Sequence, residues 1–455
     1  MKQIGRYIIR GLLGQGGMGK VYRVELPPIG KIAALKLLRP DPLLVKLLGI
    51  SRLTDQFTSE ARTLAGLQHP HIVSIHDFDH WRSMPFYVMD YYANNIGAII
   101  GESYTTESPS RVLPVDRALE YTRQILEALA ALHDAGIIHR DIKPFNLLIT
   151  AQDRLKLCDF GLSKLRGEIY SGPRNLNVGS PYYAAPEQEK NPDIVDQSAD
   201  LYSVGVTLYR LLTGHLPEAS PGAPQYLPPS HLNSDLDQIW DDFLAQSMAF
   251  SPQERFTSAI SMRHALDKLV DHWQSQKNKT CALPPADKET TWTMTQRLPL
   301  RAEPLKLTPE EIAPQLDLDT LWRPKKYFKN DFEVQDDAII IDRANSLVWQ
   351  RQGSNLPLAW ESAHSYVTQL NKTQFGGQTT WRLPTMAELV TLLRPSPQAS
   401  DLCLPSLFGL TQRHLWSADR RSYIAAYFVE AQMGFVGWSD ISAPHYVRAV
   451  SSVNF

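Results

Sequence analysis

The spacing of apolar residues changes along the chain and predicts successive kinds of structure. Between Gly5 and Leu38, short apolar and polar runs alternate and are interrupted by glycines, which predicts strands joined by turns. Further along, the apolar spacing becomes helical, with a glycine stop at Gly214. Three such stretches predict helices: 55–67, 115–136 and 199–214. We expect a small sheet-rich lobe and then a larger helical lobe ending near Trp273.

The pattern changes again after the helical lobe. Residues 273–330 contain scattered prolines and threonines without sustained periodicity, so we interpret them as a linker with one short helix at 308–316. From about Phe332 the chain becomes aromatic and strand-like. The predicted fold class is α+β, in three parts: domain 1–272, linker 273–330 and domain 331–455.

Composition narrows the class of protein. A hydrophobic content of 43% and a charged content of 21% are typical of globular proteins. A formal net charge of −2 does not favour nucleic acid or a membrane surface as partner. The three cysteines are scattered, and there is no signal-peptide pattern or long apolar run. We therefore expect a cytoplasmic protein without a membrane span.

A glycine-rich stretch, GQGGMGKV, is the first candidate for binding chemistry. Gly14, Gly16 and Gly19, with Val21 two residues on, would let backbone N–H groups approach a phosphate closely. A strand follows the third glycine, which argues against a dinucleotide-binding fold, and the GK[ST] ending of a Walker loop is missing. Alone, the motif also fits an ordinary glycine hairpin.

A lysine and a glutamate further along form a candidate ion pair. Lys36 lies in an apolar strand, where it is either a surface lysine with a buried stem or a cation directed at phosphate oxygens. Glu60 lies on a predicted helix that could pack over the sheet. Residues 37–59 separate the two, and they must bring Glu60 back over the strand that carries Lys36.

Polar residues gather in HRDIKPFN and CDFG. Asn146 and Asp159 supply hard oxygens of the kind that Mg²⁺ prefers beside phosphates. Asp141 could then orient a hydroxyl and accept its proton. Lys143 could stabilise charge on a transferred group.

These motifs, in this order and spacing, resemble the bacterial Ser/Thr protein kinases of eukaryotic type over residues 5–272. The resemblance implies a bilobal kinase fold, ATP and Mg²⁺ as cofactors, and protein substrates. It implies catalysis by Asp141 with Lys143, and metal binding by Asn146 and Asp159. The implied ATP-binding residues are Gly14, Gly16, Gly19, Val21, Lys36, Glu60 and the hinge residues Met89, Asp90 and Tyr92.

The same resemblance implies supporting roles around the site. Asp200 would brace the catalytic loop, and Arg255 would pair with Glu187 of the AAPE motif. The activation segment lacks threonine, so Ser171 is a candidate phosphorylation site whose phosphate would pair with Arg140. Ser180 matches the threonine that lies near the substrate in this family. The threonines between residues 290 and 295 are either autophosphorylation sites or part of an inert spacer.

The C-terminal part, with WRLPT and YVRAV, resembles the DUF1566 or Lcl C-terminal family. That resemblance implies a C-type-lectin-like α+β fold, related to formylglycine-generating enzymes, that displays a binding surface. Formylglycine-generating activity relies on a pair of cysteines, and this part of the chain contains only Cys403, so we expect no catalysis there. We expect Trp349 and Trp381 to be core residues. The expected surface for an unknown ligand contains exposed Arg420, Arg421, Tyr423, Tyr427, Phe435 and Trp438.

Two alternatives to a kinase with a protein-recognition domain stay open. The chain could be a nucleotide-binding scaffold that resembles a pseudokinase and displays a variable lectin-like domain. The lectin-like part could instead bind carbohydrate. Phosphate transfer separates the first alternative from an enzyme, because nucleotide binding alone would satisfy a scaffold.

Overall fold

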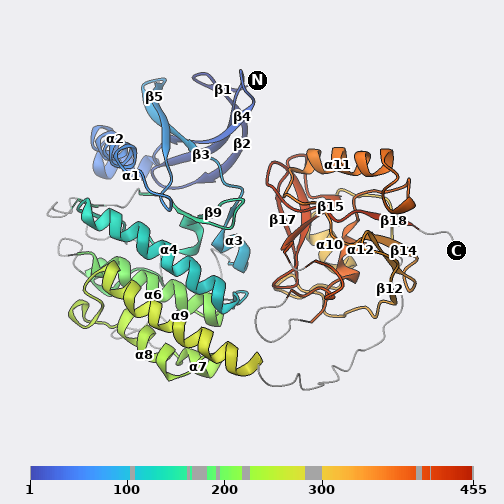
Figure 1. The fold of residues 1–455 in the computed structure, drawn as a ribbon. Helices are drawn as coiled ribbons and strands as arrows, with labels where there is room; N and C mark the ends of the chain where they lie inside the picture. The colour runs from blue at the N-terminus through green and yellow to red at the C-terminus, as the bar shows by residue number, and fades with distance from the viewer. Residues whose placement is uncertain are drawn as a thin grey trace. The chain divides into compact units, whose positions relative to one another are not determined.

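The computed structural model describes most of the chain and divides it into two compact units. The described residues are 2–102, 108–160, 164–165, 182–190, 195–217, 226–281, 300–395, 402–409 and 411–452. The division lies between Thr280 and Cys281. Each unit contains both helices and strands (Figure 1).

The N-terminal lobe of the first unit is a six-stranded antiparallel sheet, ordered β1-β2-β3-β4-β6-β5. The alternating pattern and glycine turns of residues 5–38 correctly predicted strands joined by turns, which are β2, β3 and β4. The strands are β1 Gln3–Ile4, β2 Tyr7–Gln15, β3 Gly19–Leu26, β4 Lys31–Leu38, β5 Ile75–Trp81 and β6 Met84–Asp90.

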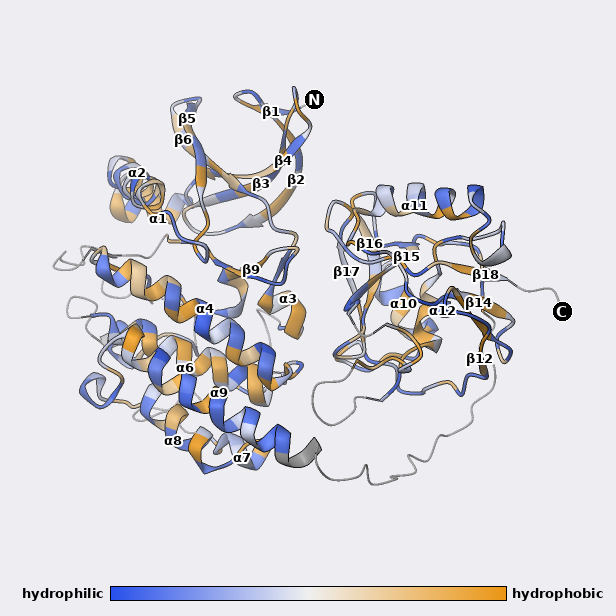
Figure 2. Cartoon of the chain, viewed as in Figure 1, coloured by the Kyte–Doolittle hydropathy of each residue, from blue (hydrophilic) through white to orange (hydrophobic). Residues whose placement is uncertain are grey.

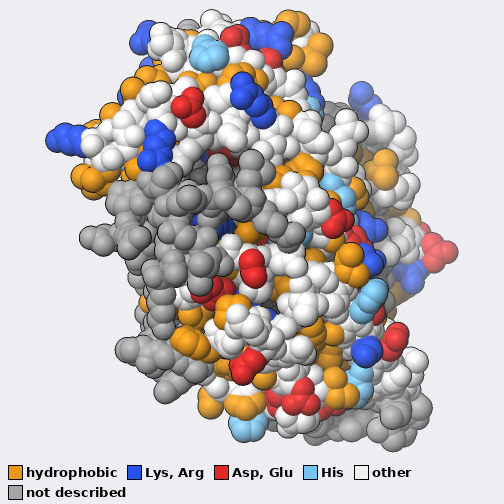
Figure 3. Space-filling view, turned by 90° about the vertical axis from the view of Figure 1, so that its left-hand side faces the viewer, with side chains coloured by type: hydrophobic (Ala, Val, Ile, Leu, Met, Phe, Trp, Pro, Cys, Tyr) orange, Lys and Arg blue, Asp and Glu red, His pale blue; other side chains and the backbone are white. Residues whose placement is uncertain are grey.

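Two helices, α1 Pro42–Leu48 and α2 Ile50–Gly66, follow β4 and account for the long segment before Glu60. The buried face of α2 packs against the sheet through Phe57 and Ala61 (Figure 1). Helix α1 has no buried residue. Figure 3, turned toward this side, shows hydrophobic side chains interspersed with Lys and Arg over the upper part of the molecule.

The second lobe is helical and is organised around one buried helix. Every residue of α6, Ser198–Thr213, is buried, and the left-handed Gly214 (φ 75°) ends it as predicted. In Figure 2, hydrophobic and hydrophilic residues alternate along the helices of this lobe. The other helices are α3 Ile96–Ile100, α4 Val115–Asp134, α5 Pro186–Lys190, α7 Pro229–Leu232, α8 Gln238–Ser247 and α9 Ala259–Cys281.

Short strands and turns near the helical lobe carry the candidate catalytic residues. Two small antiparallel sheets have the orders β10-β9-β7 and β11-β8. A 3-10 turn, η1 Pro144–Asn146, leads into β9, and a second, η2 Pro252–Glu254, precedes α9. The strands are β7 Asn94–Asn95, β8 Ile137–Ile138, β9 Leu147–Ile149, β10 Leu155–Leu157 and β11 Lys164–Leu165.

The second unit contains two antiparallel sheets, β12-β13-β14-β18 and β15-β16-β17. Trp349 and Trp381 are buried, as expected. The strands are β12 Phe332–Val334, β13 Ile339–Asp342, β14 Leu347–Gln350, β15 His414–Arg420, β16 Ala425–Glu430, β17 Phe435–Asp440 and β18 Val450–Ser452. The helices are α10 Pro309–Gln315, α11 Trp360–Lys372 and α12 Met386–Thr391, with a 3-10 turn η3 Phe375–Gly377.

The predicted linker differs from the structure at both ends. Helix α9 continues past residue 272 to Cys281. At the other end, residues 300–330 pack into the core of the second unit through side chains that include Leu307 and Ile312. The short helix predicted at 308–316 is present as α10. No helix within the described ranges is long and apolar enough to cross a membrane.

Candidate active site

The glycine-rich stretch forms the tip of the β2–β3 hairpin. The Gly16 amide donates to the Gly19 carbonyl at 2.9 Å, which closes the turn. The Gly17 carbonyl accepts from the Asp41 amide at 2.9 Å, so the tip is also tied to the chain after β4. Val21 of β3 lies opposite Lys36 of β4 in register. The predicted glycines are therefore held on the same sheet as the predicted lysine.

The close packing of β3 against β4 leaves no room for a side chain at Gly19. A Cβ at Gly19 would lie 2.3 Å from the Leu37 carbonyl oxygen, whereas one at Gly16 would meet no described atom within 4 Å. Gly19→Ala is expected to lower the free energy of unfolding by about 1–3 kcal/mol. Gly16→Ala is the matched control and should change it by less than about 0.5 kcal/mol. Urea unfolding of both variants measures the difference, and equal midpoints would contradict this packing.

The predicted ion pair is present and buried. Lys36 Nζ lies 2.8 Å from Glu60 Oε1 and 3.0 Å from Asp159 Oδ1. The Lys36 side chain is 9% exposed and the Glu60 side chain 4%, which excludes a snorkelling surface lysine. Tyr87 of β6 also donates its hydroxyl to Glu60 Oε1 at 2.8 Å, a contact that we did not predict.

The charges of this cluster reinforce one another. Burial alone would lower the pKa of Lys36, but the Asp159 and Glu60 carboxylates raise it well above its usual value. The Lys36 charge lowers the pKa of Asp159 to about 2, although its side chain is 49% exposed. At neutral pH the lysine is therefore a cation and Asp159 a carboxylate.

The residues predicted to carry catalysis meet around Asp141. Its Oδ2 accepts from Lys143 Nζ at 2.8 Å and from Asn146 Nδ2 at 2.9 Å, and Asn146 Nδ2 also reaches the Asp141 carbonyl at 2.8 Å. The Cys158 amide donates to the Asn146 carbonyl at 3.0 Å, which links this loop to the residue before Asp159. The predicted group of Asp141, Lys143 and Asn146 is thus a single hydrogen-bonded cluster.

Asp200 braces this loop from α6. Its fully buried carboxylate accepts from the His139 and Arg140 amides at 2.9 and 2.7 Å, and from His133 Nε2 at 2.9 Å. Arg140 has a φ of 68°, a left-handed conformation that costs of order 1–3 kcal/mol for a non-glycine residue. The hydrogen bonds of Asp200 offset that cost, and Gln188 adds another by donating to the Arg140 carbonyl at 3.0 Å.

The predicted pair of Arg255 and Glu187 is also formed. The guanidinium donates to both carboxylate oxygens, at 2.6 and 2.8 Å, in the bidentate geometry that arginine favours. Arg255 further donates to the carbonyls of Ala249, Ser198 and Phe250. This arginine therefore ties α5 to the segment before α9.

The predicted hinge residues lie at and just after the end of β6. Met89 and Asp90 pair with Ala34 and Ala33 of β4, and Tyr92 follows, partly buried. The Asp90 side chain is held by His76 Nε2 at 2.7 Å and Lys31 Nζ at 3.4 Å. Contact with a nucleotide at Asp90 would therefore be made by its backbone. Ser171, Ser180 and the threonines at 290–295 lie outside the described residues.

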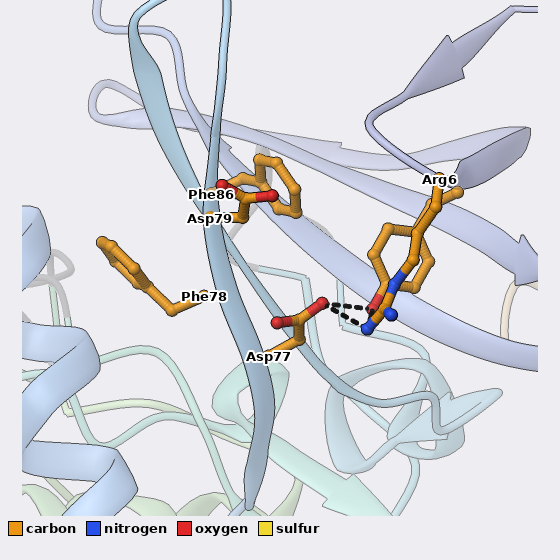
Figure 4. Close-up of a pocket in the computed structure, with 6 residues that line it drawn as sticks. Arg6, Asp77, Phe78, Asp79 and Phe86 are labelled. Carbon is orange, nitrogen blue, oxygen red and sulfur yellow. Dashed lines mark hydrogen bonds and ion pairs between the residues drawn. The ribbon is translucent and has the colours of Figure 1, made fainter.

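A hollow of about 280 Å³ lies elsewhere on the N-terminal sheet (Figure 4). In it, Arg6 and Tyr7 donate to Asp77 Oδ2 at 2.8 and 2.6 Å, and Phe78, Asp79 and Phe86 complete the lining. None of these residues belongs to the predicted nucleotide or catalytic set. The hollow is therefore separate from the candidate active site.

The expected binding surface of the second unit is only partly exposed. Tyr423 is 77% exposed and Arg421 is exposed, while Arg420 and Trp438 are partly buried. Tyr427 was predicted to be exposed, but it is fully buried and donates its hydroxyl to the Leu307 carbonyl at 2.9 Å. The same prediction for Phe435 was also wrong. Tyr427 is buried because the segment around Leu307 covers its face of the sheet, whereas Phe435 packs beside Phe428 with ring centroids 6.4 Å apart.

Comparison with known proteins agrees with the motifs. Residues 338–451 match the Lcl C-terminal domain family. The serine/threonine-protein kinase PksC of Streptomyces coelicolor is 34% identical over 288 residues, which cover 60% of this chain and 50% of that protein. The serine/threonine-protein kinase PknB of Mycobacterium leprae is 32% identical over 278 residues, covering 58% and 43%. The chain thus spans half or less of the length of these two relatives.

Among solved structures, the PknI kinase domain of Mycobacterium tuberculosis is 27% identical in sequence, with a TM-score of 0.45. The match covers 59% of this chain and 97% of the PknI kinase domain. Residues 7–267, more than half of the 455-residue chain, match the protein kinase domain family. The chain therefore belongs to the protein kinase domain family.

Proposed function

We propose that this protein is an ATP- and Mg²⁺-dependent serine/threonine protein kinase. The observation that carries the proposal is the joint geometry of two clusters, Lys36 with Glu60 and Asp159, and Asp141 with Lys143 and Asn146. A scaffold that only binds nucleotide has no need of the second cluster. We place this activity in the cytoplasm, as the three scattered cysteines suggest.

The residues present fit a magnesium ion. Asp159 is held ionised by Lys36 while its side chain stays half exposed, and the amide nitrogen of Asn146 is used on Asp141, which leaves the amide oxygen as an acceptor. Hard carboxylate and amide oxygens are the ligands that Mg²⁺ prefers. Asn146 and Asp159 would hold the metal, which when bound neutralises charge on the phosphate oxygens.

The remaining steps belong to the side chains of this protein. Lys36, fixed by Glu60, would hold phosphate oxygens of ATP beneath the glycine hairpin. Asp141 would orient a Ser or Thr hydroxyl and accept its proton as the oxygen attacks the γ-phosphorus and the bond to ADP breaks. Lys143, 2.8 Å from Asp141 Oδ2, would stabilise negative charge on the transferred phosphoryl group.

Transfer of labelled γ-phosphate from ATP to dephosphorylated casein, followed by phosphoamino-acid analysis, tests this function. We expect phosphoserine or phosphothreonine and a requirement for Mg²⁺. Tight nucleotide binding without transfer would favour the scaffold alternative instead.

We further propose the domain arrangement of a kinase and a C-terminal C-type-lectin-like recognition domain that selects a protein partner. Three cation–π pairs, each a Lys or Arg side chain over an aromatic ring, support a binding surface on this domain. Lys306 Nζ lies 3.9 Å from the centre of the Tyr423 ring, and the guanidinium carbons of Arg420 and Arg421 lie 4.5 Å from the rings of Trp360 and Trp438. Such pairs hold their side chains in place before a partner arrives, which lowers the entropy cost of binding.

The double variant Arg421→Ala/Tyr423→Ala tests this surface. We expect phosphorylation of the natural protein partner to fall by at least about tenfold, because Tyr and Arg dominate binding hot spots. Transfer to casein should stay unchanged. Phosphorylation of the partner is measured by comparing the proteins that wild type and the double variant label in a cell extract. Leu356→Ala, at an exposed apolar residue of the same unit, is the control. An unchanged labelling pattern in the double variant would contradict the surface.

A further inference from the structure

The carboxylate of Glu60 is held by two donors on one of its oxygens. Lys36 Nζ and Tyr87 Oη both lie 2.8 Å from Oε1. The other oxygen, Oε2, is buried, and no donor in the described part of the chain reaches it. Tyr87 therefore supplies one of the two hydrogen bonds that hold this carboxylate against Lys36.

Packing fixes the position of the Tyr87 hydroxyl. Tyr87 lies opposite Lys36 in the register of β4 and β6, and its side chain is 1% exposed. Its ring packs at 5.1 Å from Phe57 of α2, within a small core that also contains Leu38 and Ala61. The ring therefore joins the sheet to the helix that carries Glu60.

The Tyr87 hydroxyl stays protonated, and therefore a hydrogen-bond donor, over the whole physiological pH range. Burial, reinforced by the Glu60 charge, raises the pKa of Tyr87 well above its usual value. A neutral phenol that donates to a carboxylate makes one of the stronger kinds of hydrogen bond in a protein.

We propose that Tyr87 is a positioning residue that latches α2 in the active position by holding Glu60 onto Lys36. This inference rests on the proposed kinase function, in which Lys36 needs Glu60 in order to point at phosphate. Tyr87 is not among the residues predicted to bind ATP, metal or substrate. Its hydroxyl contacts Glu60 and the centre of its ring lies 5.7 Å from Lys36 Nζ, so we expect it to act by positioning this ion pair. The family motifs do not contain it, because the hydroxyl matters here through a contact between β6 and α2.

Removal of the hydroxyl shifts the balance between seated and displaced Glu60. One hydrogen bond to a buried charge is enough to change that equilibrium by a factor of ten or more. We therefore expect Tyr87→Phe to lower kcat/KM for phosphate transfer to casein by about tenfold. The ring and its packing remain, so the midpoint of thermal unfolding should move little.

A matched control comes from another buried tyrosine. Tyr121 of α4 is fully buried and donates its hydroxyl to the Asp153 carboxylate at 2.5 Å, and neither residue belongs to the predicted nucleotide-binding or catalytic set. Tyr121→Phe removes the same chemical group from a similar environment. It should leave kcat/KM unchanged if the effect at Tyr87 depends on Glu60.

The test combines kinetics with hydrogen exchange on the full chain. In wild type and in the two tyrosine variants, kcat/KM and the exchange of backbone amides in Ile50–Gly66 are measured. The latch predicts faster exchange of α2 in Tyr87→Phe and not in Tyr121→Phe. The same Tyr87 substitution in a Glu60→Ala background should then have no further effect on either quantity.

Each outcome decides between the latch and simple packing. Unchanged α2 exchange in Tyr87→Phe overturns the latch whether or not the protein transfers phosphate. A loss of activity that persists in the Glu60→Ala background also overturns it, since the residue would then act independently of Glu60. If wild type transfers no phosphate, the kinase proposal fails, and α2 exchange alone decides for or against the latch.

Discussion

Replacement of Asp141 by alanine is expected to lower the rate of phosphate transfer by a factor of about 10² to 10⁴, the usual contribution of a positioned general base. The carboxylate is the centre of the proposed catalytic cluster, bound by Lys143 and Asn146 at 2.8 and 2.9 Å. Without it the acceptor hydroxyl has no group to orient it and no proton acceptor. Initial rates of casein phosphorylation at saturating ATP measure the loss.

Nucleotide binding separates this effect from misfolding. The hydrogen bonds of the Asp141 carboxylate described above join it to Lys143 and Asn146 and not to Lys36, so the affinity for ADP should change by less than about threefold. Asp55→Ala removes a carboxylate from the exposed side of α2 and should leave the rate unchanged. A rate in Asp141→Ala within a factor of three of wild type would refute the assigned role.

The second large effect is expected in the C-terminal unit. Asp419 is fully buried and accepts two hydrogen bonds from Arg301 at 2.7 Å, one from the Leu305 amide at 2.8 Å and one from the Met386 amide at 2.7 Å. Asp419→Ala leaves all of these donors without their acceptor. We expect the free energy of unfolding of this unit to fall by about 3–5 kcal/mol, as when one partner of a buried ion pair is removed.

Hydrogen exchange resolved by peptide can assign that loss to one unit. Protection should fall across residues 300–452 and stay constant across residues 7–267. Asp337→Ala is the matched control, because that carboxylate is fully exposed and pairs with Arg351 at the surface. Unchanged protection of residues 300–307 in Asp419→Ala would mean that this segment does not belong to the unit's core.

The catalytic group was predictable from sequence because its members lie close together in the chain. Asp141, Lys143 and Asn146 fall within one short loop, so their order and spacing already bring them together. The pairing of Lys36 with Glu60 was harder to predict, since α1 lengthens the segment between them. Tyr87 was missed because a contact across two elements leaves no local motif.

The C-terminal unit shows where local patterns fail. Residues 300–330 lack periodicity and contain prolines, yet the Leu307 amide donates to the Arg420 carbonyl at 2.9 Å and Ile312 is fully buried. That covering segment explains both errors, the overlong linker and the predicted exposure of Tyr427. Burial of both faces of a sheet by distant chain cannot be inferred from strand alternation alone.

The most direct test of the central claim is intact mass spectrometry of the wild type and the Asp141→Ala variant after incubation with ATP, Mg²⁺ and dephosphorylated casein. The account predicts added phosphoryl groups on wild type, on casein or on both, and on neither protein in the variant's reaction. Equal masses in the two reactions, with nucleotide bound in both, would contradict it and leave a nucleotide-binding scaffold.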